Sequence, residues 1–168
     1  MEKTNFKCLL ENKEIFETEA FIGRNGFTKD KTEGDGKTPI GVYKTGILFG
    51  THEILKENYV KINENLYWVD DINSKYYNQL VDITKTQVDW KSAEHLIKYP
   101  KQYEYAIELK TNPNNIPGKG SAIFLHCSVN RLTAGCIAIE KEKMKKIFEV
   151  LEKDATINIG KNIEFVIK

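Results

Sequence analysis

The sequence predicts a mixed α/β fold dominated by strands, closer to a sandwich or a barrel than to alternating βαβ units. Short strand-like runs dominate the N-terminal part, a hairpin pattern ends the chain, and two or three helical segments are expected to pack on the strands. Because 168 residues can bury a sizeable core, we expect one domain over residues 1–168.

The N-terminal half is predicted to hold a hairpin followed by a long loop. The runs "FKCLL" and "EIFETEAFIG" flank the polar turn "ENK", which is typical of a β-hairpin. Residues 24–43, "RNGFTKDKTEGDGKTPIGVY", are rich in Gly, Lys and Asp and indicate an ordered loop or a pair of turns. Long loops in compact domains are commonly functional. Residues 66–81 are predicted to be a β-segment followed by an irregular stretch.

The C-terminal half alternates between strands and helices. "DWKSAEHLIKYP" predicts a short helix ended by Pro100, and "YEYAIEL" predicts a strand. In "EKEKMKKIFEVLEKD" the apolar side chains fall on one face of an amphipathic helix, at Met144, Ile147, Phe148 and Leu151. "TINIG" and "NIEFVIK" predict a final hairpin.

The charge balance argues against a nucleic-acid or membrane partner. The chain has 25 basic and 24 acidic residues, so no global field attracts a polyanion. No apolar stretch reaches the roughly 18 residues that span a bilayer. The start, "MEKTNFKCLL", lacks the features of a signal peptide, so we expect either a cytosolic protein or a missing targeting segment.

The cysteines predict a free thiol and no metal site. Cys8, Cys127 and Cys136 cannot all pair within one chain, and their spacing fits no zinc-ligand set. We therefore expect no metal and no cofactor.

His126 and Cys136 form a candidate acyl-transfer pair. The apolar run "AIFL" predicts a buried strand that ends at His126, and "CIAI" starts another strand after a polar loop. An imidazole in this position can take the thiol proton and lower the cysteine pKa from about 8.5 toward neutrality. Gly135 allows close approach of a carbonyl substrate to the backbone.

A purely structural interpretation also fits this local pattern. Free cysteine is among the most buried residue types, and a histidine at a strand end is commonly just hydrogen-bonded. Cys8, in an apolar strand, is predicted to belong to the core.

Two segments together resemble the L,D-transpeptidase catalytic domain family, the YkuD-like group of bacterial peptidoglycan enzymes. His126 followed by Thr133, Ala134, Gly135 and Cys136 is similar to the family's histidine, loop and Ser/Thr-x-Gly-Cys signature. "GRNGFTKDKTEGDGKTPIGVY" resembles its upstream "DGKTPxG" segment. The resemblance covers residues from about 20 to 151 and implies a strand-dominated L,D-transpeptidase (YkuD-like) β-sandwich with a few peripheral helices.

The resemblance also implies roles for individual residues. Cys136 would be the nucleophile and His126 the base, with the carbonyl of Cys127 or Ser128 orienting the ring. The amides of Gly135 and Cys136 would form the oxyanion hole. The implied substrate is a peptidoglycan stem tetrapeptide, which loses its terminal D-alanine through a thioester and joins a neighbouring stem in a 3→3 cross-link. Carbapenem-type β-lactams are the implied inhibitors, and the implied location is extracytoplasmic, in the cell wall or periplasm.

Two departures from the family pattern leave bond and acceptor specificity open. Many members carry His before the Gly-Cys pair and Arg two residues after the cysteine, where this chain has Ala134 and Ala138. Candidate substrate-binding residues are Arg131, Thr133 and Lys37. The alternatives are an L,D-carboxypeptidase, a peptidoglycan amidase or thiol peptidase on the same dyad, and a non-catalytic wall-binding module.

Overall fold

The first two strands form the predicted N-terminal hairpin. The computed structural model describes residues 3–168. β1 (Lys3–Leu10) and β2 (Lys13–Phe21) pair antiparallel. Glu11 and Asn12 make the turn with positive φ angles of 50° and 67°, as tight hairpin turns require.

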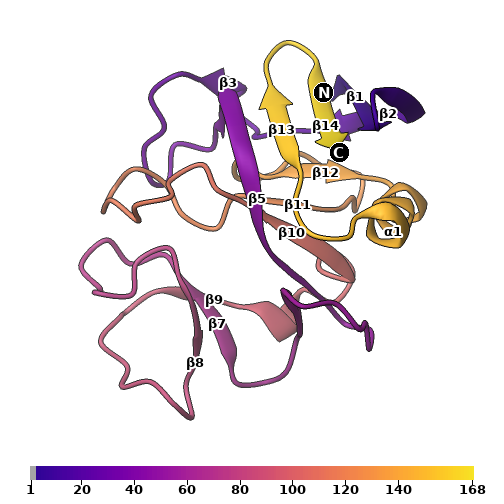
Figure 1. Cartoon of the computed structure of the whole chain (residues 1–168). Coiled ribbons are helices and arrows are strands. Elements are labelled where there is room, and N and C mark those ends of the chain that lie inside the picture. Colours follow the sequence, from indigo (N-terminus) through magenta and orange to yellow (C-terminus); the bar gives the residue numbers. More distant parts are fainter. Residues whose placement is uncertain (1–2) are drawn as a thin grey trace.

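The main sheet curls until β10, at one end, pairs with β5, the strand next to the other end. Its strand order is β10-β11-β12-β2-β1-β14-β13-β5-β6, and β10 also pairs with β5. The predicted dominance of strands is confirmed, and the sheet is barrel-like (Figure 1). The sandwich that the resemblance implied is not confirmed, because the β10–β5 pairing closes the sheet. The remaining strands of this sheet are β5 (Gly41–Gly50), β6 (Tyr59–Lys61), β10 (Tyr105–Leu109), β11 (Phe124–Cys127), β12 (Ile137–Ile139), β13 (Thr156–Ile159) and β14 (Ile163–Ile167).

One α-helix, α1 (Lys141–Val150), contacts β10 and β11. Its predicted apolar face is confirmed, since Met144, Ile147 and Phe148 are buried, as is Leu151 just after the helix. We expected two or three helices, whereas residues 3–168 contain this α-helix and one 3-10 turn, η1 (Leu96–Lys98). No helix in that part of the chain is long and apolar enough to cross a membrane.

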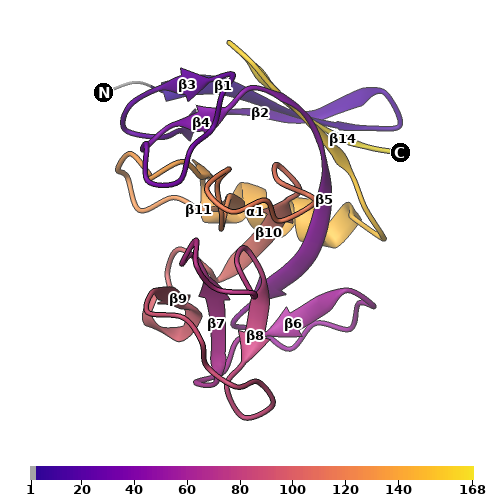
Figure 2. The ribbon, with the colours of Figure 1, turned by 90° about the vertical axis from the view of Figure 1, so that its left-hand side faces the viewer.

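A small second sheet replaces the short helix predicted around residue 95. β7 (Leu66–Val69) lies between β8 (Leu80–Asp82) and β9 (Ala93–His95). This sheet lies at the opposite end of the molecule from β1 and β2 (Figure 2). The helix prediction was wrong because pairing with β7 overrides the weak local helical preference. The pairing sets Glu94 opposite Trp68.

Candidate active site

Two neighbouring parallel strands bring His126 and Cys136 to one cavity. β11 pairs in parallel with β12, with His126 opposite Ala138. Cys136 lies two residues before Ala138, and side chains two apart on a strand share a face. Both His126 and Cys136 line a cavity of about 310 Å³.

The His126 ring is buried and held in one tautomer. Its Nδ1 lies 2.9 Å from the carbonyl oxygen of Cys127. Because a carbonyl oxygen can only accept, Nδ1 carries the hydrogen and Nε2 is the basic nitrogen. The ring of Tyr103 packs edge-on at 5.6 Å between centroids. Burial lowers the pKa of His126 to about 4, although the hydrogen bond to Cys127 opposes this shift.

The Cys136 thiol forms two hydrogen bonds with the backbone. Its Sγ donates to the carbonyl oxygen of Ala122 at 3.3 Å and accepts from the amide of Phe124 at 3.3 Å. Burial raises the pKa of Cys136 to about 12, and the nearby Glu94 carboxylate adds to this. The lowered pKa of His126 and the raised pKa of Cys136 both favour the uncharged form of these two side chains near neutral pH.

The buried neutral imidazole predicts a loss of stability in acid. Unfolded histidine has a pKa near 6.5, so between pH 6.5 and about 4 the unfolded state binds a proton that the folded state does not. The free energy of unfolding should fall across this window by about 3 kcal/mol on account of His126. Urea unfolding of the parent and of His126→Gln at pH 7 and at pH 4.5 measures this loss. If the difference in free energy of unfolding between the two proteins is the same at both pH values, the prediction is contradicted.

The two sequence segments of the family pattern meet beside Cys136. Thr38 is fully buried on β4 (Thr38–Pro39), which pairs in parallel with β3 (Phe27–Thr28). Its Oγ1 donates to the carbonyl oxygen of Gly135 at 2.8 Å and accepts from the amide of Gly23 at 2.9 Å. The "DGKTP" segment thus fixes the backbone before the candidate nucleophile.

Gly135 meets two steric demands at this point. Its φ is +145°, and a Cβ there would lie 2.9 Å from the carbonyl oxygen of Lys37, too close for a side chain. The Gly135 amide donates to Thr133 Oγ1 at 3.0 Å, while that hydroxyl donates to the Cys136 carbonyl oxygen at 2.6 Å. Because the Gly135 amide already donates to Thr133, only the Cys136 amide remains of the two donors that were expected to form the oxyanion hole.

The substrate-binding candidates fall in different places. Arg131 and Thr133 line the cavity with Cys136, and Lys37 does not. The Lys37 amide donates to Asp35 Oδ1 at 2.9 Å, which stabilises the turn.

The other two cysteines lie in the core. Cys8 is 0% exposed and Cys127 is 1% exposed. Burial raises the pKa of Cys8 to about 12 and that of Cys127 to about 11. The Cys127 thiol donates to the carbonyl oxygen of Tyr105 at 3.6 Å, on the face of β11 opposite His126.

Several residues that line the cavity were not identified from the sequence, among them Arg24, Glu94 and Tyr103. Arg24 lies in the segment "GRNGFTKDKTEGDGKTPIGVY", so the resemblance of that segment was the available signal. Glu94 lies on β9, where a helix was expected, and Tyr103 lies in a segment with no pattern that points to the site.

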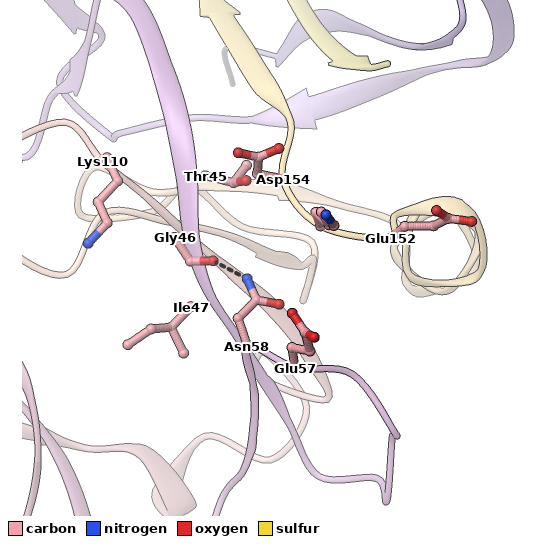
Figure 3. Close-up of a pocket in the computed structure, with 9 residues that line it drawn as sticks. Thr45, Gly46, Ile47, Glu57, Asn58, Lys110, Glu152 and Asp154 are labelled. Atoms are coloured by element: carbon pink, nitrogen blue, oxygen red, sulfur yellow. Dashed lines mark hydrogen bonds between the residues drawn. The ribbon is translucent and has the colours of Figure 1, made fainter.

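A second large cavity lies away from these residues. It has a volume of about 460 Å³, and Asn58 Nδ2 donates to the Gly46 carbonyl oxygen at 3.0 Å on its wall (Figure 3). Its lining includes no cysteine and no histidine, so it offers neither a thiolate nor an imidazole. Among residues 3–168 no group of three or more His, Cys, Asp or Glu side chains is arranged to hold a metal ion.

Comparison with known proteins identifies the family. Residues 3–159 match the YkuD family, the L,D-transpeptidase catalytic domain. No curated protein matches the chain. Among solved structures, the helical cell shape determining protein Pgp2 from Campylobacter jejuni is 17% identical with a TM-score of 0.44, over 99% of this chain and 47% of that one.

L,D-transpeptidase 1 from Mycobacterium tuberculosis is 10% identical with a TM-score of 0.35, over 99% of this chain and 63% of that one. The chain thus spans less than two thirds of either solved protein. The family match covers almost the whole chain, including both segments that meet at Cys136. The chain belongs to the YkuD family of L,D-transpeptidase catalytic domains.

Proposed function

We propose that this chain is a single catalytic domain, a cysteine-dependent L,D-transpeptidase that acts on peptidoglycan stem tetrapeptides. The observation that carries the proposal is the shared cavity of His126 and Cys136, built from adjacent parallel strands within a family of this activity. A peptidoglycan substrate puts the site of action outside the membrane, in the cell wall or periplasm.

The proposed reaction begins with a proton transfer within the neutral pair. His126 Nε2 takes the Cys136 thiol proton as the sulfur attacks the carbonyl of the third stem residue. The amide of Cys136 donates to the developing oxyanion. The imidazolium then protonates the leaving nitrogen, D-alanine departs, and a thioester remains on Cys136. The second step joins the acyl group to an amine of a neighbouring stem.

Two arginines are suited to hold a substrate carboxylate. Arg24 and Arg131 both line the cavity, and within residues 3–168 neither forms an ion pair. Guanidinium groups bind carboxylates in a bidentate geometry. We propose that they replace the arginine that many family members carry at the position of Ala138.

The defining experiment uses a stem tetrapeptide and mass spectrometry. Incubation with the parent protein is expected to release D-alanine and to form a cross-linked dimer. Release without a dimer would favour the L,D-carboxypeptidase, in which water is the acceptor. Cleavage elsewhere in the stem would favour an amidase or thiol peptidase. Binding to peptidoglycan with no product at all would favour a non-catalytic wall-binding module and would contradict the proposal.

A further inference from the structure

Two cavities meet at Cys136. The larger one contains His126, and a second one of about 190 Å³ also borders Cys136 but not His126. A thioester formed on Cys136 would therefore border two separate spaces. The residues that border both cavities are Arg24, Glu94, Ala134 and Cys136.

Glu94 is the carboxylate that borders both spaces. Its Oε1 accepts from the Tyr103 hydroxyl at 2.9 Å, and within residues 3–168 it forms no ion pair. Burial raises the pKa of Glu94 to about 7, and the nearby Asp70 and Glu33 carboxylates raise it further, against the Tyr103 hydrogen bond. A carboxyl group in this condition can gain or lose a proton near neutral pH.

The smaller cavity has four other charged residues, Arg24, Lys31, Glu33 and Asp70. Arg24 is a cation, and Asp70, which accepts from the Ser92 hydroxyl, does not border the larger cavity. Lys31 pairs with Asp35. Glu33 Oε1 accepts from the Tyr77 hydroxyl at 2.7 Å and from the Ser121 hydroxyl at 2.6 Å. Glu94, with one hydrogen bond and a place beside the candidate nucleophile, is the carboxylate best placed to meet an incoming cation.

We propose that Glu94 binds the ammonium group of the acyl acceptor and takes a proton from it, so that a primary amine resolves the thioester on Cys136. This inference rests on the proposed function, because it concerns the second step of that reaction. It makes Glu94 the residue that favours amine over water.

The proton and electron balance of this step is complete. A primary amine has a pKa near 10 and arrives as an ammonium ion, which cannot attack a carbonyl. Transfer of one proton to Glu94 frees the nitrogen lone pair, and the amine attacks the thioester carbon. The C–S bond breaks as the amide forms. His126 takes the second amine proton and returns it to the Cys136 thiolate, while Glu94 releases its proton to solvent.

The test is the partition of the acyl-enzyme between amine and water. The donor is a stem tetrapeptide, and the acceptor probe is glycinamide, a primary amine without a carboxylate. The ratio of amide to acid product is counted per acyl-enzyme formed, so it does not depend on the acylation rate. Glu94→Gln keeps an acceptor for the Tyr103 hydroxyl and removes the charge, and the ratio should fall at least about tenfold.

The matched control is Glu64→Gln, which removes the same charge from an exposed side chain outside both cavities and should leave the ratio within about twofold of the parent. If Glu94→Gln does not fold, Glu94→Asp is the test variant. Its carboxylate is shorter by one methylene, so the ratio of amide to acid product should fall by at least about threefold. A parental ratio in the folded Glu94 variant overturns this inference alone. A parent that forms no acyl-enzyme overturns the proposed function instead.

Discussion

Replacement of Cys136 by alanine is expected to abolish covalent labelling by a carbapenem. The parent should gain one adduct by intact mass, because the thiolate formed with help from His126 opens the β-lactam as it would attack a stem carbonyl. Cys136 borders both cavities at the site and is the only partly exposed cysteine in the described chain. The Cys136→Ala protein should gain no adduct.

The other two cysteines supply matched controls for this experiment. Cys8→Ala and Cys127→Ala remove core thiols that line neither cavity, so each variant should still gain one adduct. Neither thiol lines the cavity that holds His126, so neither has the imidazole there to take its proton. An adduct that persists in Cys136→Ala and disappears in Cys127→Ala would refute the assignment of the nucleophile.

Much of the fold could be predicted from the sequence because its signals are local. The hairpin of β1 and β2 and the amphipathic face of α1 follow from side-chain period and turn residues, and both are confirmed. The closure of the sheet could not be predicted, since it depends on pairing between β10 and β5, which lie far apart in the chain. Residues 93–95 show the same limit, because β7 supplies the partner that makes them a strand.

The residues of the candidate site also fall into a group that the sequence predicts and a group that only the tertiary structure reveals. A histidine after an apolar run and a cysteine before another one are visible in the sequence, and their shared cavity follows once β11 and β12 pair. Glu94 and Tyr103 could not be predicted as cavity residues, because the patterns of their segments indicate local secondary structure and not which cavity the side chains line. The role of Thr38 depends on a hydrogen bond to Gly135, 97 residues away.

The sequence pattern favoured a cysteine pKa near neutrality, whereas burial raises the pKa of Cys136 to about 12. Sequence alone allows either an ion pair or a neutral pair, because burial decides between them. The buried ring, which lies 7% exposed, and the buried thiol favour the neutral pair, as the pKa of about 4 for His126 and about 12 for Cys136 indicate. In the proposed reaction the imidazolium and the thiolate would therefore form only as the sulfur attacks the substrate carbonyl.

Replacement of His126 by alanine is expected to lower the rate of acylation by at least about 100-fold, the low end of what general base catalysis contributes. In the parent, protonation of the ring removes the base, so activity should fall as the pH drops through about 4 rather than through 6.5. The measurement is kcat/KM for D-alanine release between pH 3.5 and 8, with circular dichroism at each pH to separate inactivation from unfolding.

His52→Ala serves as the control, since His52 is half-exposed, bonds to Glu104 at 3.0 Å and lies outside both cavities. His52→Ala should keep the parental kcat/KM and the parental fall of kcat/KM at low pH. A His126→Ala protein within threefold of the parent would exclude the ring as the base. If kcat/KM of the parent instead falls near pH 6.5, and this fall is absent in His126→Ala, then His126 is still the base but the neutral resting pair is contradicted. The imidazole would then lie in a more polar setting than the one built by Tyr103 and the strands around it.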